Sequence, residues 1–328
     1  MSILRRRFLH LAAGAAGTAA LPIAANLAKA EAFPVRPIHI VVGFPAGGVA
    51  DIAARLIGQP LQQRMGQAIV VDDRPGAGGN IGAAAVVRAA PDGYTLTLAG
   101  ANNSIDATLY KKLSFDFIRD IAMVAGIMRG PFVMVVNPSL PARNVTEFIA
   151  YAKANPGKVN MGSGGNGTVT HLAGELFSMM AGVKLVHVPY RGEGAALTDL
   201  MGGRMQVVFA NLSTCAGLIH DGRVRALGVT TSQPWPTLAD VPPIATVLPG
   251  YDVSGWFALG APKATPPATI AVLNKAVNAC LAEPAVVKRI HESGAAPMVI
   301  SASALDAFVA ADTEKWAKVV KFSGATVD

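Results

Sequence analysis

The sequence predicts an α/β fold with two doubly wound lobes joined by crossover strands. Short apolar runs alternate with amphipathic helical segments along the whole chain, which is typical of mainly parallel sheets with helices on both faces. Glycine-rich turns join a strand to a helix at two places, 43–51 and 162–168. Two apolar runs, 131–136 and 255–260, bracket a middle block and are predicted to cross between the lobes.

The strands are predicted from short apolar runs rich in β-branched residues. They are expected at 38–43, 68–72, 94–99, 132–136, 184–188, 206–210, 225–229 and 256–260, with a further short strand entering the second glycine turn near 159–161.

The helices are predicted from apolar residues at helical spacing and from capping residues. A helix is expected over 51–65, and Pro60 should kink or end it because proline lacks the amide hydrogen that a helix needs. The predicted caps are Asn144 with Glu147 for a helix through Tyr151, and Thr168 or Thr170 for a helix through Met180. Two long C-terminal helices should cover 265–282 and 303–320, with Ser303 and Asp306 capping the second.

The predicted organisation has three parts. Residues 1–30 form a signal peptide, residues 31–130 and 257–328 form the first lobe, and residues 131–256 form the second lobe. About 300 residues are enough for two lobes with separate cores.

The N-terminus has the pattern of a secretory signal. Arg5, Arg6 and Arg7 precede an uncharged run over 8–28, which ends in the small-residue site Ala28-Lys29-Ala30. The Arg-Arg-x-Phe-Leu pattern suggests the twin-arginine route. The alternative is a membrane anchor, which needs about 20 strongly apolar residues, whereas this run is mostly alanine and glycine. We expect cleavage near Ala30 and a periplasmic protein.

Charge and cysteine content exclude some function classes. The formal net charge of +7 falls to +3 once the four basic residues of the signal peptide are removed, which is too little for nucleic-acid binding. Cys215 and Cys280 are the only cysteines, with no CxxC motif. We expect two separate buried thiols, although an oxidising compartment would permit a disulfide.

The two glycine-rich turns predict an anion site. A strand that runs through such a turn into a helix points backbone N–H groups and the positive end of the helix dipole at whatever lies above the turn. With two such turns and no catalytic residues beside them, the chain is expected to hold an anion without transforming it.

Enzymatic alternatives have weaker support. The second turn matches G-x-G-x-x-G, but the next strand, 184–188, ends in no acid that could bind a ribose; Arg191 could instead meet a 2′-phosphate. The sequence has no G-x-S-x-G elbow and no histidine pair at metal-ligand spacing, so we expect no catalytic residue, metal or cofactor. His187, in a predicted strand, is expected to be a core histidine.

Motifs in order along the mature chain are similar to one family. They are Gly-Phe-Pro-Ala-Gly-Gly-x-x-Asp at 43–51, Asp-Arg-Pro-Gly-Ala-Gly-Gly-Asn-Ile-Gly at 73–82, Pro-Asp-Gly-Tyr-Thr-Leu at 91–96, Asn-Gly-Thr at 166–168, Val-Pro-Tyr-Arg-Gly at 188–192 and Asp-Leu-Met-Gly-Gly at 199–203. The chain resembles the Bug-type solute-binding proteins, which are the extracytoplasmic receptors of tripartite tricarboxylate transporters.

The resemblance implies a two-lobed periplasmic-binding-protein fold of type II-like topology, an organic carboxylate bound between the lobes, and delivery of it to membrane transporter subunits. In this family main-chain amides, hydroxyls and water typically hold the carboxylate. The ligand-binding residues implied for this chain are Phe44, Ala46, Gly47, Gly48, Asp51, Asn102, Asn103, Ser163, Gly164, Asn166, Gly167, Thr168 and His171. Asp51 could equally be a simple helix N-terminal acid.

One position departs from the family pattern. Many relatives place an aspartate after the phenylalanine that corresponds to Phe209, facing the cleft, whereas this chain has Ala210. Loss of that acid removes a partner for an amino group. We therefore expect neutral-tailed or aromatic monocarboxylates, or dicarboxylates, to bind better than aspartate or glutamate.

The predicted function is that of a monomeric, non-enzymatic receptor whose lobes close on a carboxylate. The alternatives are a periplasmic sensor subunit built on the same domain, and an enzyme that uses the glycine turns for a phosphorylated substrate or cofactor.

Overall fold

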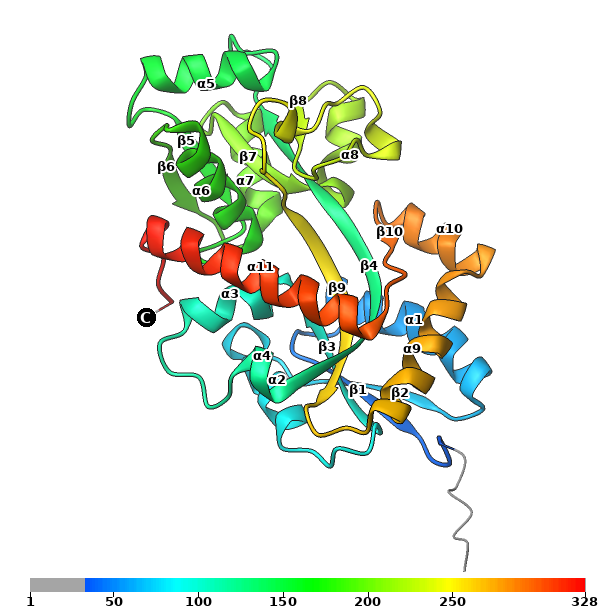
Figure 1. Ribbon diagram of the computed structural model, residues 1–328. Helices are drawn as coiled ribbons and strands as arrows, with labels where there is room; N and C mark the ends of the chain where they lie inside the picture. The colour runs from blue at the N-terminus through cyan, green and yellow to red at the C-terminus, as the bar shows by residue number, and fades with distance from the viewer. Residues whose placement is uncertain (1–32, 328) are drawn as a thin grey trace, which may run out of the picture. The chain divides into compact units, whose positions relative to one another are not determined.

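The computed structural model describes residues 33–327. The predicted signal peptide over 1–30, with its cleavage near Ala30, lies outside the described residues. The described residues from Pro34 onward form one compact unit. Within it, strands and helices alternate as the sequence predicts (Figure 1).

The described residues contain ten strands. They are β1 Ile38–Val42, β2 Ile69–Asp73, β3 Thr95–Gly100, β4 Ile121–Val136, β5 Asn160–Ser163, β6 Val186–Pro189, β7 Val207–Asn211, β8 Arg225–Val229, β9 Ser254–Pro262 and β10 Ala296–Pro297.

Eleven α-helices and three 3₁₀ turns connect these strands in the described part of the chain. The helices are α1 Val49–Met65, α2 Asn80–Val87, α3 Ala101–Leu109, α4 Phe117–Asp120, α5 Val145–Ala154, α6 Val169–Ala181, α7 Glu193–Met201, α8 Leu212–His220, α9 Pro267–Leu281, α10 Pro284–Glu292 and α11 Ala302–Ser323, and the 3₁₀ turns are η1 Ala77–Gly79, η2 Pro236–Leu238 and η3 Ile244–Thr246.

The strands follow the order β2-β1-β3-β9-β4-β7-β5-β6, and β8 and β10 each pair with β4. We call β1, β2, β3, β9 and β10, with the part of β4 before Phe132, the first strand group. We call β5, β6, β7 and β8, with β4 from Phe132 onward, the second strand group. Pairing is parallel among β1, β2 and β3 and again among β5, β6 and β7.

Strand β4 belongs to both groups. Residues 121–131 pair with β9, whereas residues 132–136 pair with β7 and β8. The predicted crossover at 131–136 therefore lies in the second half of a 16-residue strand, and the predicted crossover at 256–260 lies in β9. The sequence prediction missed the first half of β4, which is buried along almost its whole length. The predicted lobe boundaries stay a prediction.

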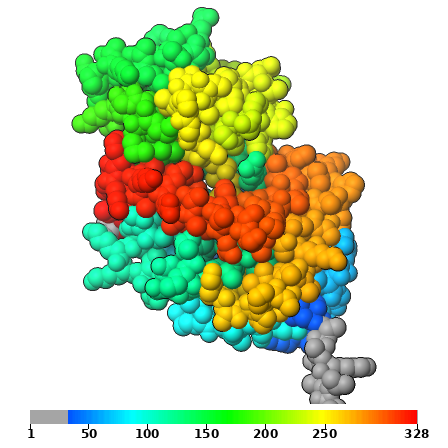
Figure 2. Space-filling view, in the orientation of Figure 1, coloured from blue at the N-terminus to red at the C-terminus, as the bar shows by residue number. Residues whose placement is uncertain are grey.

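Helix α11 contacts both strand groups. It packs against α3 and β4 and also against α6, which follows β5. Figure 2 shows this helix, in red, lying across the molecule between the green and yellow residues of the second group and the cyan and orange residues of the first. Strand β4 and helix α11 therefore both contact the two groups, and the chain also passes from β8 of the second group to β9 of the first.

Pro60 does not end α1, which excludes one of the two predicted effects, an end or a kink. The helix continues to Met65 and ends at Gly66 in the left-handed conformation, with φ 67°. Leu56, Ile57 and Leu61 are fully or almost fully buried around the proline. Their burial offsets the cost of an interior proline, roughly 3 kcal/mol or more for the lost hydrogen bond and the clash of the ring with the preceding turn.

Two of the three predicted caps are observed. The side chain of Asn144 accepts a hydrogen bond from the amide of Glu147, and Thr168 accepts one from the amide of His171. The predicted cap of α11 is wrong: Ser301 caps this helix through the amide of Ala304, whereas Asp306 accepts a hydrogen bond from the amide of Met123.

Both cysteines are free and buried, as predicted. Among the described residues no single helix combines the length and apolar character that a membrane crossing requires. Helices α9 and α10 taken together meet these criteria by length and composition alone, with a bend of 75° between them.

Candidate functional site

A cavity of about 400 Å³ is the candidate site. Its wall contains the residue just before each of five helices and, in four of them, residues of the first turn as well; each helix has nine residues or more. These residues are Gly48, Val49 and Ala50 at α1, Gly100, Ala101 and Asn102 at α3, Thr168, Val169 and Thr170 at α6, Gly192 and Glu193 at α7, and Asn211 at α8.

The topology explains why these helices start at one place. Each of the five follows a strand, namely β1, β3, β5, β6 and β7, and these strands are parallel within their group. The carboxyl ends of parallel strands share one edge of a sheet, so the helices that follow them begin at that edge. The cavity therefore lies where the ligand sites of open α/β sheets are found.

The helix starts give the cavity a positive electrostatic character. The first N–H groups of a helix have no partner inside the helix and carry the positive end of its dipole. Among the described residues, α1, α7 and α8 have no side-chain cap on these groups. The described lining contains no Lys, Arg or His, and Glu193 is its only titratable side chain.

The crossover strands supply the apolar part of the wall. Phe132 of β4 and Gly255, Trp256 and Phe257 of β9 line the cavity, together with Phe44. Trp256 is 1% exposed. Its indole N–H donates to the Asp312 carboxylate of α11 at 3.0 Å, which fixes this part of the wall.

The first glycine turn is held by Asp51. Its carboxylate accepts a hydrogen bond from the amide of Gly47 at 2.8 Å and pairs with Arg55 at 2.6 Å. Asp51 is 4% exposed and does not line the cavity. It stabilises the turn whose last residue, Gly48, opens α1.

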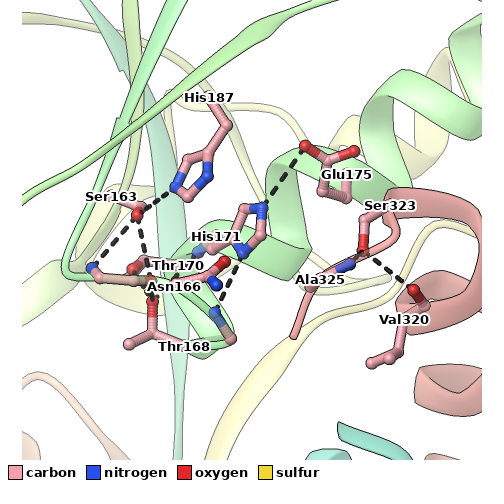
Figure 3. Close-up of polar contacts among 12 residues, drawn as sticks. Ser163, Asn166, Thr168, Thr170, His171, Glu175, His187, Val320, Ser323 and Ala325 are labelled. Atoms are coloured by element: carbon pink, nitrogen blue, oxygen red, sulfur yellow. Dashed lines mark hydrogen bonds and ion pairs between the residues drawn. The ribbon is translucent and has the colours of Figure 1, made fainter. Parts of the chain in front are cut away.

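Beneath the second glycine turn lies a network of polar side chains (Figure 3). The hydroxyl of Ser163 lies 2.6 Å from Nε2 of His187, and the amide of Gly167 donates to Nδ1 of His171 at 3.1 Å. The two imidazole rings stack, with centroids 3.6 Å apart, and Nε2 of His171 lies 3.5 Å from Glu175.

This network supports the turn from below. Burial, and secondarily His171, lowers the pKa of His187 to about 4, so its ring is neutral at physiological pH. Ser163 is fully buried and His171 is 3% exposed. The Ser163–His187 pair resembles a nucleophile with its base, yet a buried hydroxyl cannot reach a substrate.

Glu193 brings a carboxylate to the cavity wall. Its Oε1 accepts hydrogen bonds from the amide of Asn211 at 2.6 Å and from the hydroxyl of Thr214, and its Oε2 accepts one from Nδ2 of Asn211 at 2.7 Å. Burial raises the pKa of this half-buried group, whereas the donors from Thr214 and Asn211 act in the opposite direction.

Five of the fourteen residues predicted to bind ligand line the cavity: Phe44, Gly48, Asn102, Gly164 and Thr168. The others do not. Ala46 and Gly47 are exposed beside the first turn, Asn103 accepts the amide of Gly100 at 2.9 Å, and Asn166 bonds the carbonyl of Thr326. Asp51, Ser163, Gly167 and His171 hold the turns from behind.

The prediction that Ala210 faces the cleft is wrong. Ala210 is fully buried and packs with Val133, Val208 and Cys215, because successive residues of β7 point to opposite covered faces of the sheet. The cavity is reached only at the end of this strand, by Asn211. Glu193 and Thr170 also line the cavity, although neither is among the predicted ligand-binding residues. For Glu193, an acid in the first turn of a helix beside the Tyr-Arg-Gly motif was a signal in the sequence.

Comparison with known proteins agrees with this geometry. Residues 53–324 match the model of the tripartite tricarboxylate transporter family receptor. Protein BugT from Bordetella pertussis is 35% identical over 300 residues, which cover 90% of this chain and 92% of that protein.

Two solved structures share the fold. The R. palustris protein Rpa4515 with adipate has a TM-score of 0.75 and 35% identity, over 90% of this chain and 99% of that one. MatC from Rhodopseudomonas palustris with bound malate has a TM-score of 0.72 and 31% identity, over 88% of this chain and all of that one. The two-lobed α/β fold and the predicted resemblance to Bug-type proteins are thereby confirmed, and the chain belongs to the receptors of the tripartite tricarboxylate transporter family.

Proposed function

We propose that this protein is an extracytoplasmic receptor that binds a small organic carboxylate in the cavity and presents it to a membrane transporter. The observation that carries the proposal is the convergence of five helix N-termini on one cavity of about 400 Å³ whose described lining has no basic side chain. Helix N-termini bind carboxylates through backbone N–H groups and the dipole. The volume lies within the range of small-molecule sites.

The family supports the rest of the proposal. Its members are receptors, and two structural neighbours were solved with the carboxylates adipate and malate. We extend three features to this chain: a periplasmic location after cleavage near Ala30, a monomeric state, and delivery to transporter subunits. A receptor also agrees with the lining, because a single titratable group gives no acid–base pair for catalysis.

Gly164→Val tests the site. Gly164 lines the cavity, and a Cβ there would meet only ordinary contacts, with the nearest at 3.4 Å from the hydroxyl of Thr170. The variant should therefore fold but block the approach of a ligand to the start of α6. Loss of one hydrogen bond to a charged group costs about 1.5–3 kcal/mol, so affinity should fall about ten- to a hundredfold.

Calorimetric titration with adipate, malate, hexanoate and 6-aminohexanoate provides the measurement. Gly217→Val is the matched control, because Gly217 is an exposed helical glycine outside the cavity with no neighbour within 4 Å of its Cβ position. Binding of acids and of their amides with equal affinity would contradict the anion site. An unchanged affinity in Gly164→Val would show that the carboxylate binds elsewhere in the protein.

A further inference from the structure

The acid on the cavity wall has an unusual position. Helix α8 begins directly after Asn211, and Glu193 accepts both the amide and the side-chain N–H of that residue. The carboxylate of Glu193 therefore occupies the N-terminus of α8, where an external anion could otherwise bind. Side chains also serve two other starts, Thr168 at α6 and Asn103 at α3, but only at α8 is the acceptor a carboxylate on the cavity wall.

Glu193 has no charged partner within the described residues. Its contacts are three hydrogen bonds, to the amide and the side chain of Asn211 and to the hydroxyl of Thr214. A carboxylate offers about four acceptor positions, so one position on Oε2 stays open. The donors and the helix dipole stabilise the ionised form, but no cation in the described part of the chain pairs with it.

The rest of the cavity wall offers contacts for the parts of a ligand that lie away from Glu193. The starts of α1, α3 and α6 offer backbone N–H groups on the other parts of the wall, and Phe44, Phe132 and Phe257 cover an apolar stretch. A ligand in the cavity would thus meet amide donors, aromatic rings and, at the start of α7, a carboxylate. A second carboxylate beside Glu193 would be repelled.

We propose, on the basis of the receptor function proposed above, that Glu193 determines ligand specificity and selects carboxylates whose other end carries a protonated amine. The N–H groups of the ammonium bind the open acceptor position on Oε2, and its charge neutralises Glu193. This reverses the expectation drawn from Ala210. The acid that the sequence appeared to lack is supplied from the start of α7.

Matched ligand pairs test the proposal on the unmodified protein. 6-Aminohexanoate and adipate have similar length and differ at one end, as do 4-aminobutanoate and succinate. By calorimetric titration at pH 7, the amino member of at least one pair should bind ten- to a hundredfold more tightly than the diacid, the difference expected for a hydrogen bond between charged groups. Tighter binding of the diacid in both pairs would overturn the proposal.

Glu193→Gln tests the residue. It keeps the size of the side chain and removes its charge. The affinity for the amino acid, divided by the affinity for the matching diacid, should therefore fall at least tenfold. Asp199→Asn is the control: this acid lies on the same helix, outside the cavity, and contacts Tyr190 and Arg204. If Glu193 only caps α8, the variant lowers the melting temperature and leaves the affinity ratio unchanged, which would overturn the proposal.

The outcomes separate this inference from the receptor function. Binding of the diacids without binding of the amino acids would overturn the inference and leave the receptor function in place. Failure of hexanoate, both diacids and both amino acids to bind would overturn both.

Discussion

His187 and His171 show how buried side chains hold a loop that itself forms the site. His187 shares a hydrogen bond with the hydroxyl of Ser163, and His171 accepts one from the amide of Gly167, both at the second glycine turn. Neither ring reaches the cavity, yet the position of Thr168 and Gly164 on its wall depends on them. The sequence placed His171 at the margin of the site and His187 in the core, and both residues lie directly behind the turn.

Protonation of His187 should destabilise the protein in mildly acidic solution. An unfolded histidine has a pKa of about 6.5, whereas the pKa of His187 in the fold is about 4. Between these values the unfolded chain binds the additional proton, so stability is full above pH 6.5 and falls as the pH drops. From pH 7 to pH 5 this group alone removes about 2 kcal/mol of unfolding free energy.

Urea unfolding of the protein and of His187→Gln at both pH values measures this effect. The stability difference between pH 7 and pH 5 should shrink by about 2 kcal/mol in the variant. Asp106, whose pKa burial raises to about 7, acts in the opposite direction, but it does so in both proteins and cancels in the comparison. His220→Gln, at an exposed ring, should change nothing; equal pH dependence in all three proteins would contradict the prediction.

At the scale of elements, helix starts divide into those that the chain caps and those that it leaves open. Asn144 and Ser301 cap α5 and α11, which begin outside the cavity. Helices α1 and α7 begin at the cavity without a side-chain cap within the described residues. These two caps therefore stabilise the fold away from the site, whereas the open starts of α1 and α7 are available to a ligand. Helix α6 is an exception, because Thr168 caps it at the cavity wall.

Removal of a cap should thus cost stability without affecting binding. Asn144 accepts the amide of Glu147 at 2.8 Å, and its own amide donates to the Glu147 carboxylate at 2.8 Å. Asn144→Ala should lower the unfolding free energy by about 1 kcal/mol, or a few degrees in melting temperature. Lys153→Ala, at an exposed position of the same helix, should change it far less. A loss of ligand affinity in Asn144→Ala would contradict the separation of roles.

Secondary structure was largely predictable from the sequence because local rules determine it. Apolar runs located most strands, and Asn144 and Thr168 marked their helices. Pro60 does not end its helix, one of the two effects predicted there, because tertiary packing overrides a local preference. The prediction was wrong at Ser303, where Ser301 makes the cap instead. The first half of β4 was missed because its alanine- and glycine-containing run gains its strand partners from β9, more than a hundred residues later.

The site was predictable only in part, because it depends on the whole molecule. The glycine turns identified Phe44, Gly48, Gly164 and Thr168, since a turn and the following helix start are local features. Glu193 and Asn211 belong to neighbouring helix starts that only the order of β5, β6 and β7 brings together. Whether Ala210 faces the cavity could be predicted only by knowing which faces of β7 are covered by other elements.

Contacts between the two strand groups close the molecule beside the cavity. Gly167, in the second glycine turn, lies against Leu109 at the end of α3, so that a Cβ on Gly167 would be 2.4 Å from Cδ2 of Leu109. The side-chain amide of Asn166 donates a hydrogen bond to the carbonyl of Thr326, just after α11. The first contact joins the turn after β5 to the helix that follows β3, and the second joins the same turn to the residues after α11. We expect both to hold the lobes closed on a ligand.

Gly167→Ala should therefore weaken ligand binding by holding α3 and α6 apart. The new methyl group would overlap the side chain of Leu109, which is 5% exposed and has little space to move. The change also strains the backbone, because Gly167 has a φ of 72°. Gly182→Ala is the matched control: it imposes the same kind of strain, at a φ of 62°, with no neighbour within 4 Å of the added Cβ.

Both variants should lose roughly 1–2 kcal/mol of stability from backbone strain, but only Gly167→Ala should also lose affinity. Titration with the tightest-binding acid from the matched pairs measures this loss. Adding Leu109→Ala removes the overlapping side chain, so the double variant should recover most of the affinity that Gly167→Ala loses, as expected for residues in direct contact. Equal affinities in Gly167→Ala and Gly182→Ala would show that the Leu109 contact does not control closure, and absence of recovery in the double variant would assign the loss to the turn itself.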